Sequence, residues 1–139
     1  MPTTIRDIMT SDPIRVPTTE SVRSVAQQMR DGDVGAVIVE EDGELWGLIS
    51  DRDLVTRVVA EGTDPDTVTV SDVQTTELTT VGPDDDLERA IELMREHAVR
   101  RLPVVEEGMT VGIVALGDLA VDRDPGSVLG QISAAQPDD

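Results

Sequence analysis

Several residue types are missing from this chain of 139 residues, and each absence narrows what the protein can be. There is no cysteine, so neither a disulfide framework nor a thiolate metal site can form. Phenylalanine and tyrosine are also absent, and Trp46 is the only aromatic residue. A folded core must therefore consist of aliphatic side chains and methionine, for which the 38% of hydrophobic residues suffices.

The charged residues are mostly of one sign. Lysine is absent, and eleven arginines stand against 29 acidic residues, which gives a net charge of −18. Such a surface repels phosphate backbones and anionic lipids, so we expect neither nucleic acid nor a membrane as a partner. No apolar run approaches the roughly 20 residues of a membrane span, and the first residues do not resemble a signal peptide. We therefore expect a cytoplasmic protein.

An internal repeat is the strongest pattern that is present. A shift of 65 positions aligns the chain with itself without a gap over about fifty residues. The apolar residues of one predicted amphipathic helix fall on those of another: Val22, Val25, Ala26 and Met29 on Leu87, Ala90, Ile91 and Met94. Short β-branched runs joined by tight turns follow in both copies: 36–39 with 45–49, and 102–105 with 110–114.

These patterns predict an α/β (α+β) fold made of two βαββα repeats. We place the repeats at residues 5–62 and 69–132, followed by a disordered tail at 133–139. A second helix is expected from Asp51 to about Glu61, and a shorter one in the second copy because Pro125 interrupts it. One copy is too small to bury its own sheet well, so we expect the two to pack sheet to sheet.

Three segments resemble the signature sequences of CBS domains, which occur in tandem as a Bateman module. They are Gly47–Leu54, Val99–Val105 and Ile5–Thr10. The plan of the chain is similar to small stand-alone two-CBS proteins, including hypoxic response proteins. The resemblance implies two sheets related by a pseudo-twofold axis and two clefts between the repeats. It also implies an adenosine ligand such as AMP, ADP, ATP, NAD or S-adenosylmethionine, a homodimer, and an unknown effector partner.

The resemblance implies a ribose site at Ser50 and Asp53, with Arg52 between them. A carboxylate at a helix start can accept hydrogen bonds from both ribose hydroxyls, and the serine hydroxyl can reach the ribose or phosphate. The same spacing is also a helix capping box, which needs no ligand. Both interpretations stay open from the residues alone.

The second repeat is implied to complete this cleft. Leu78 and Thr79 would flank the adenine, Pro103 would support it, and Arg100 and Arg101 would hold phosphate. Alternatively, these arginines form surface ion pairs with acids such as Glu96 or Glu106, which would contribute little.

The other implied cleft is degraded. Asp118 keeps the ribose acid, but Ala115 replaces the hydroxyl residue, and Gly35 and Ala36 stand where the second copy has its arginines. Adenine would lie near Pro13 and Ile14. We therefore predict at most one competent site per chain.

Three classes of function remain open. The favoured class is a regulatory module that senses an adenine nucleotide, and the alternative is a ligand-free interaction or scaffold protein of stress response. An enzyme is not expected, and neither is a catalytic cofactor or a metal, because no nucleophile–base pair, metal cluster or glycine-rich phosphate loop is evident. His97 has no partner at a fixed spacing, and Trp46 is interpreted as a core or dimer contact.

The composition, rich in aspartate and free of lysine, resembles that of halophilic proteins. Because counterions screen self-repulsion, we expect the melting temperature to rise from low to multimolar KCl. Thermal unfolding in a KCl series measures this, and an unchanged melting temperature would contradict it.

Overall fold

The computed structural model describes residues 3–73 and 78–123. The chain divides into two compact units. One, the first-repeat unit, runs from Ile14 to Leu78, and the other, the second-repeat unit, combines the chain up to Pro13 with the chain from Thr79 onward. The predicted tail and the interruption at Pro125 lie outside the described residues.

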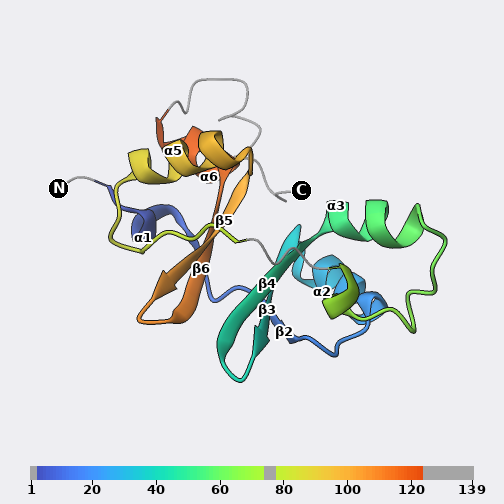
Figure 1. Cartoon of the computed structure of the whole chain (residues 1–139). Helices are drawn as coiled ribbons and strands as arrows, with labels where there is room; N and C mark the ends of the chain where they lie inside the picture. Colours follow the sequence, from blue (N-terminus) through green and yellow to red (C-terminus); the bar gives the residue numbers. More distant parts are fainter. Residues whose placement is uncertain (1–2, 74–77, 124–139) are drawn as a thin grey trace. The chain divides into compact units, whose positions relative to one another are not determined.

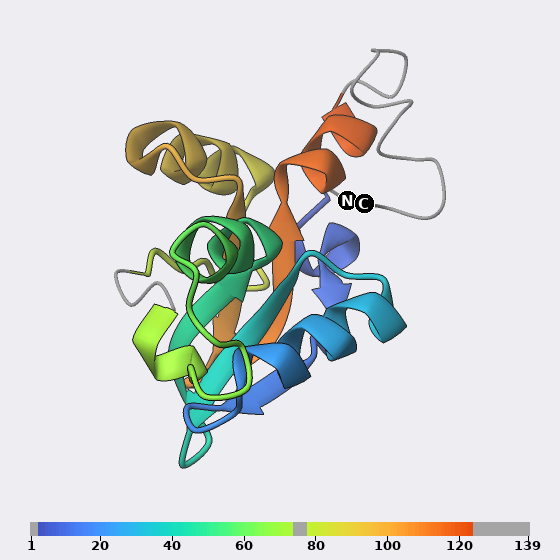
Figure 2. The same ribbon diagram turned by 90° about the vertical axis from the view of Figure 1, so that its right-hand side faces the viewer.

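The first-repeat unit holds a three-stranded sheet in the order β2-β3-β4. Strands β2 and β3 are parallel, and β3 and β4 are antiparallel. In Figures 1 and 2 the helices α2 and α3 lie beside the strands of this unit. Its elements are β2 (Arg15–Pro17), α2 (Val22–Gly32), β3 (Ala36–Glu41), β4 (Glu44–Ser50), α3 (Asp51–Leu54), the π-helical turn η1 (Val55–Val59) and α4 (Val70–Val73).

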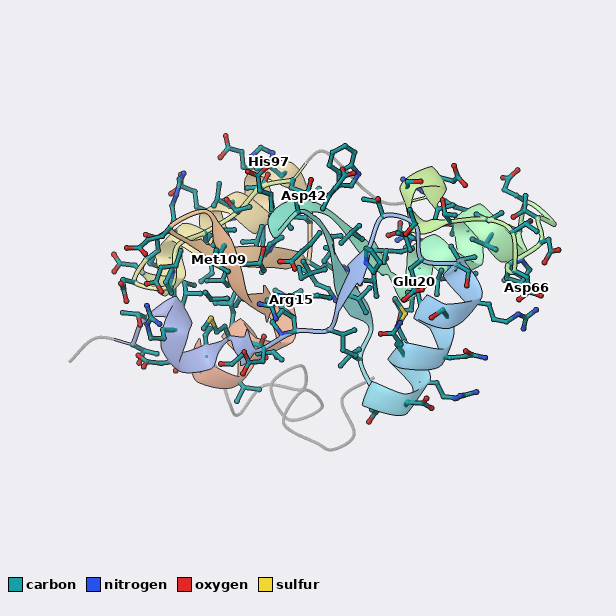
Figure 3. The ribbon with its side chains drawn as sticks, turned by 90° about the horizontal axis from the view of Figure 1, so that it is seen from below. Arg15, Glu20, Asp42, Asp66, His97 and Met109 are labelled. Carbon is teal, nitrogen blue, oxygen red and sulfur yellow. The ribbon has the colours of Figure 1, made fainter. Side chains whose placement is uncertain are left out.

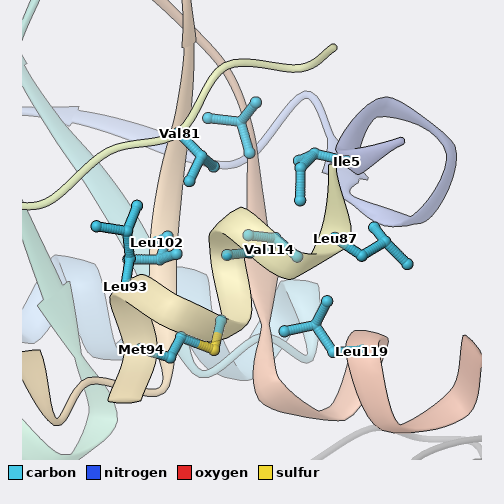
Figure 4. Close-up of a cluster of buried hydrophobic side chains, with 10 residues drawn as sticks. Ile5, Val81, Leu87, Leu93, Met94, Leu102, Val114 and Leu119 are labelled. Atoms are coloured by element: carbon cyan, nitrogen blue, oxygen red, sulfur yellow. The ribbon is translucent and has the colours of Figure 1, made fainter. Parts of the chain in front are cut away.

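The second-repeat unit holds a sheet in the order β1-β6-β5. Its aliphatic core joins residues from both ends of the sequence, as Ile5, Leu87, Leu102 and Val114 show in Figure 4. Its elements are α1 (Ile5–Ile8), β1 (Thr10–Ser11), α5 (Leu87–His97), β5 (Arg101–Glu106), β6 (Met109–Ala115) and α6 (Leu116–Arg123).

The predicted repeat is confirmed in the backbone. Val16 pairs in parallel with Val39, and Val81 pairs in parallel with Val104, with the same shift of 65. Both hairpins turn through two residues of positive φ, which is the pattern of a type I′ turn and favours glycine at the second position. The φ values are 54° and 80° at Asp42 and Gly43, and 52° and 81° at Glu107 and Gly108. Figure 3 labels Asp42 at one of these turns.

The opening segments of the two repeats are exchanged between the units. Helix α1, from the first repeat, binds the second-repeat unit through a hydrogen bond from the Ile5 amide to the Asp85 carbonyl at 3.1 Å. Helix α4, from the second repeat, binds the first-repeat unit through the equivalent bond, from the Val70 amide to the Glu20 carbonyl at 2.9 Å. The compact units are therefore a different division of the chain from the sequence repeats.

Two further points concern the surface. Trp46 is 46% exposed, so it is not a core residue of the chain, and its role as a dimer contact stays a prediction. Among the described residues, no helix is long and apolar enough to cross a membrane.

The exchange predicts where core mutations act. Ile5 and Val70 are both fully buried, each in the core of the unit opposite to its own repeat. We expect Ile5→Ala to cost about 2–4 kcal/mol of unfolding free energy and to raise amide hydrogen exchange first in β5 and β6. Val70→Ala deletes fewer methyl groups, so it should cost less and act first in β3 and β4. Exchange that rises in the opposite sheet would contradict the exchanged arrangement.

Candidate functional site

Ser50 and Asp53 meet at the junction where β4 passes into α3. The Asp53 Oδ2 atom accepts hydrogen bonds from the Ser50 amide at 2.8 Å and from the Ser50 hydroxyl at 3.0 Å. The Ser50 Oγ atom in turn accepts from the Asp53 amide at 3.2 Å. This is a complete capping box, so the structural interpretation of the motif is confirmed. The capping box holds the Asp53 carboxylate in place, and the carboxylate can still accept further hydrogen bonds.

The other oxygen of Asp53 faces an arginine that the sequence interpretation missed. Arg57 Nε lies 3.8 Å from Asp53 Oδ1, and the side chain of Asp53 is only 15% exposed. Arg57 Nη1 also donates to the Val73 carbonyl at 3.1 Å. The i,i+4 spacing of Asp53 and Arg57 was a visible signal for the ion pair. Arg52, by contrast, is exposed.

The second repeat reproduces this junction without the hydroxyl. Asp118 Oδ2 accepts from the Ala115 amide at 2.8 Å, where β6 passes into α6. Ala115 offers no side-chain acceptor for the helix start. Position 122, which corresponds to Arg57, is an aspartate.

Arg100 and Arg101 lie at the start of β5 in the second-repeat unit. Arg100 is exposed, and its carbonyl accepts from the Leu116 amide at 2.8 Å. Arg101 is half-buried and stands opposite Ala115 in the strand register. Within residues 3–73 and 78–123, neither has an acid within ion-pair distance. The ion pairs found there involve other arginines: Arg6, Arg15, Arg23, Arg30, Arg57 and Arg89.

The predicted alternative for these arginines is thereby weakened. Glu106 is paired with Arg6 at 2.6 Å rather than with Arg100 or Arg101. Glu96 is in no ion pair of the described chain. The guanidinium groups of these two sequence neighbours thus keep their donors available for an anion.

Four of the remaining predicted residues, Pro13, Ile14, Leu78 and Thr79, lie in the segments that precede the main helices, and Pro103 lies in β5. Ile14 accepts through its carbonyl from the Ile38 amide at 2.9 Å. The Pro103 carbonyl accepts from the Val81 amide at 3.1 Å, which holds the segment after Thr79 beside β5. Pro13 and Thr79 belong to the second-repeat unit, and Ile14 and Leu78 to the first-repeat unit. The structure thus brings together Ser50 with Asp53, and separately Ala115 with Asp118 and Arg101.

No metal centre is evident in the described part of the chain. Across residues 3–73 and 78–123, no group of three or more histidine, cysteine, aspartate or glutamate side chains is arranged to hold an ion. His97, the last residue of α5, is labelled in Figure 3.

Sequence comparison defines the class of protein to which this two-unit arrangement belongs. The CBS domain family model matches residues 5–60 and 70–121. The chain belongs to the CBS domain family, with two tandem copies.

Individual relatives support this assignment. The chain is 42% identical over 133 residues to the CBS domain-containing protein YhcV of Bacillus subtilis, covering 93% of this chain and 94% of that protein.

The chain also superposes on the crystal structure of Hypoxic Response Protein I, which holds two coordinated zinc ions. The TM-score is 0.73 and the identity 37%, over 85% of this chain and 97% of that one.

A more distant structure shares the fold. The CBS domain pair of MJ0100, in complex with 5′-methylthioadenosine and S-adenosyl-L-methionine, has a TM-score of 0.77 and an identity of 21%, over 86% of this chain and 94% of that one. At this identity the likeness concerns the fold alone.

The two junctions offer a matched test of the capping hydroxyl. Ser50→Ala removes it from α3 and should lower the unfolding free energy by about 0.5–2 kcal/mol. Ala115→Ser adds it at the equivalent position before α6 and should raise stability by a smaller amount. Urea unfolding of both variants measures the difference. Equal stability of Ser50→Ala and the parent chain would show that the hydroxyl does not stabilise the junction.

Proposed function

We propose that this CBS pair is a regulatory module that binds an adenosine-containing ligand with residues of both repeats and signals to a separate partner. The ligand class comprises AMP, ADP, ATP, NAD and S-adenosylmethionine. No reaction is assigned to the chain, and its role is to change state when the ligand binds. A homodimer is part of the same proposal.

The observation that carries the proposal is the pair Arg100 and Arg101. In a chain with 29 acids, two adjacent arginines have no acid within ion-pair distance in the described residues. The two arginines therefore offer positive charge and hydrogen-bond donors that no acid of the described residues uses. A phosphate matches the planar donor geometry of guanidinium groups.

Asp53 supplies the complementary recognition of the sugar. Its carboxylate is fixed by Ser50 and keeps acceptor sites for the two ribose hydroxyls. Leu78, Thr79 and Pro103 are proposed to hold the adenine. The complex of the MJ0100 CBS pair with two adenosine derivatives agrees with this ligand class.

We propose a single competent site per chain. At the second site Ala115 lacks the hydroxyl, and Gly35 and Ala36 replace the arginines, so a phosphate there would have no counter-charge. The net charge of −18 disfavours multiply charged anions, so AMP should bind better than ATP at low salt.

A second candidate is a ligand-free interaction protein. The capping box favours it, because it accounts for Ser50 and Asp53 without any ligand. The likeness to Hypoxic Response Protein I is consistent with a role in stress response.

Calorimetric titration with AMP and with ATP, at high and low salt, decides between the two candidates. We expect one site per chain, and about a tenfold or greater loss of affinity in Asp53→Ala, since a hydrogen bond to a charged group contributes about 1.5–3 kcal/mol. Asp118→Ala is the matched variant, because it removes the equivalent junction bond and should leave the affinity much less affected.

Two outcomes would contradict the proposal. Two equal sites per chain would refute the asymmetry. No heat and no thermal shift with any of the adenosine compounds would favour the ligand-free protein.

A further inference from the structure

We propose that Arg57 is a positioning residue that couples the Asp53 carboxylate to helix α4, so that occupation of the ribose site stabilises α4 in the first-repeat unit. The ligand part of this inference rests on the proposed function. The coupling itself depends only on contacts inside the first-repeat unit.

Arg57 makes two contacts that join distant parts of the sequence. Its Nε lies 3.8 Å from Asp53 Oδ1, and its Nη1 donates to the Val73 carbonyl at 3.1 Å. Ser50 hydrogen-bonds the other carboxylate oxygen, so the two oxygens of Asp53 face different partners. One guanidinium therefore connects the candidate ribose acid to the end of α4.

The local helix geometry contributes to this placement. The Ala60 amide donates to the Val55 carbonyl at 2.8 Å, five residues back, which defines a π-helical turn. The Thr56 hydroxyl donates to the Arg52 carbonyl at 2.8 Å and occupies an acceptor of the preceding turn. Arg57 lies inside this wide turn, which rotates its side chain relative to those of α3. Such turns are frequent at functional sites.

Helix α4 is held in the first-repeat unit by contacts that a change at Asp53 can affect through Arg57. It belongs to the second repeat by sequence but is bound in the first-repeat unit through Val70 and Ser71, whose amides donate to the Glu20 and Thr18 carbonyls at 2.9 and 3.2 Å. Val70 and Val73 share a buried cluster with Val58 of the π-helical turn.

The second repeat does not have this arginine. Asp122 stands where the first repeat has Arg57, so the position that supplies a cation in the first repeat carries an acid in the second. The sequence thus provides the coupling at only one of the two junctions. This is the same junction that carries the serine hydroxyl.

A double-mutant cycle without ligand tests the coupling. Asp53→Asn should raise hydrogen exchange at the Val70 and Ser71 amides about two- to fivefold in the parent chain, a size expected for a half-exposed ion pair. In the Arg57→Ala background the same change should have no further effect. Arg30→Ala, an exposed arginine of α2 paired only with its neighbour Asp31, is the control for loss of charge.

Arg57→Lys separates position from charge. It keeps the charge but has a single nitrogen, so it cannot contact Asp53 and Val73 as two nitrogens of one planar group do. We expect it to behave like Arg57→Ala in the cycle. If Asp53→Asn has the same effect with and without Arg57, the coupling is overturned.

The same hydrogen-exchange measurement is then repeated with AMP bound. AMP should slow exchange at the Val70 and Ser71 amides in the parent chain and in Arg30→Ala, but not in Arg57→Ala. Arg57→Ala should also bind AMP about five- to tenfold more weakly. Equal protection in Arg57→Ala overturns the coupling and leaves the proposed function standing. If the parent chain binds no adenosine compound, the proposed function fails, and the ligand-free cycle still decides the coupling.

Discussion

The bond between an aspartate carboxylate and the backbone amide at the end of the returning strand governs both halves of this protein. It measures 2.8 Å at Asp53 and Ser50 and again at Asp118 and Ala115. In each unit it ends a strand and starts a helix within one residue, and so sets the direction in which that helix leaves the sheet. The same bond holds a charged group at the strand end, where the first repeat adds a hydroxyl and an arginine.

Much of the fold was predictable because the repeat preserves backbone chemistry. The turns at Gly43 and Gly108 and the apolar faces of α2 and α5 follow from rules about a few neighbouring residues. The exchange of α1 and α4 was not predictable from the same rules. Ile5 and Val70 are ordinary aliphatic residues that fit either core, so nothing local indicates which core each one joins.

In the candidate site, too, the residues that local sequence rules identify were predicted and the long-range contacts were not. Ser50 and Asp53 were found because the capping motif is contiguous in sequence, and Arg100 and Arg101 because adjacent arginines stand out in an acidic chain. The contact of Arg57 with Val73 was missed because it spans 16 residues and ends on a carbonyl, which every residue carries. For Trp46 the sequence left a core position and a dimer contact open, because a strand position alone does not decide which face is covered, and the exposure of the side chain excludes only the core.

The reciprocal exchange of opening segments bears on how such a chain arose. A protein with a single copy of this repeat would not fill its core with its own opening helix. Two such molecules could fill both cores if each bound the opening helix of the other. With both copies in one chain the exchange is intramolecular, which raises the effective concentration of each segment for its acceptor. The two copies need not be identical, and they differ here: the first has Ser50 and Arg57 at its junction, where the second has Ala115 and Asp122.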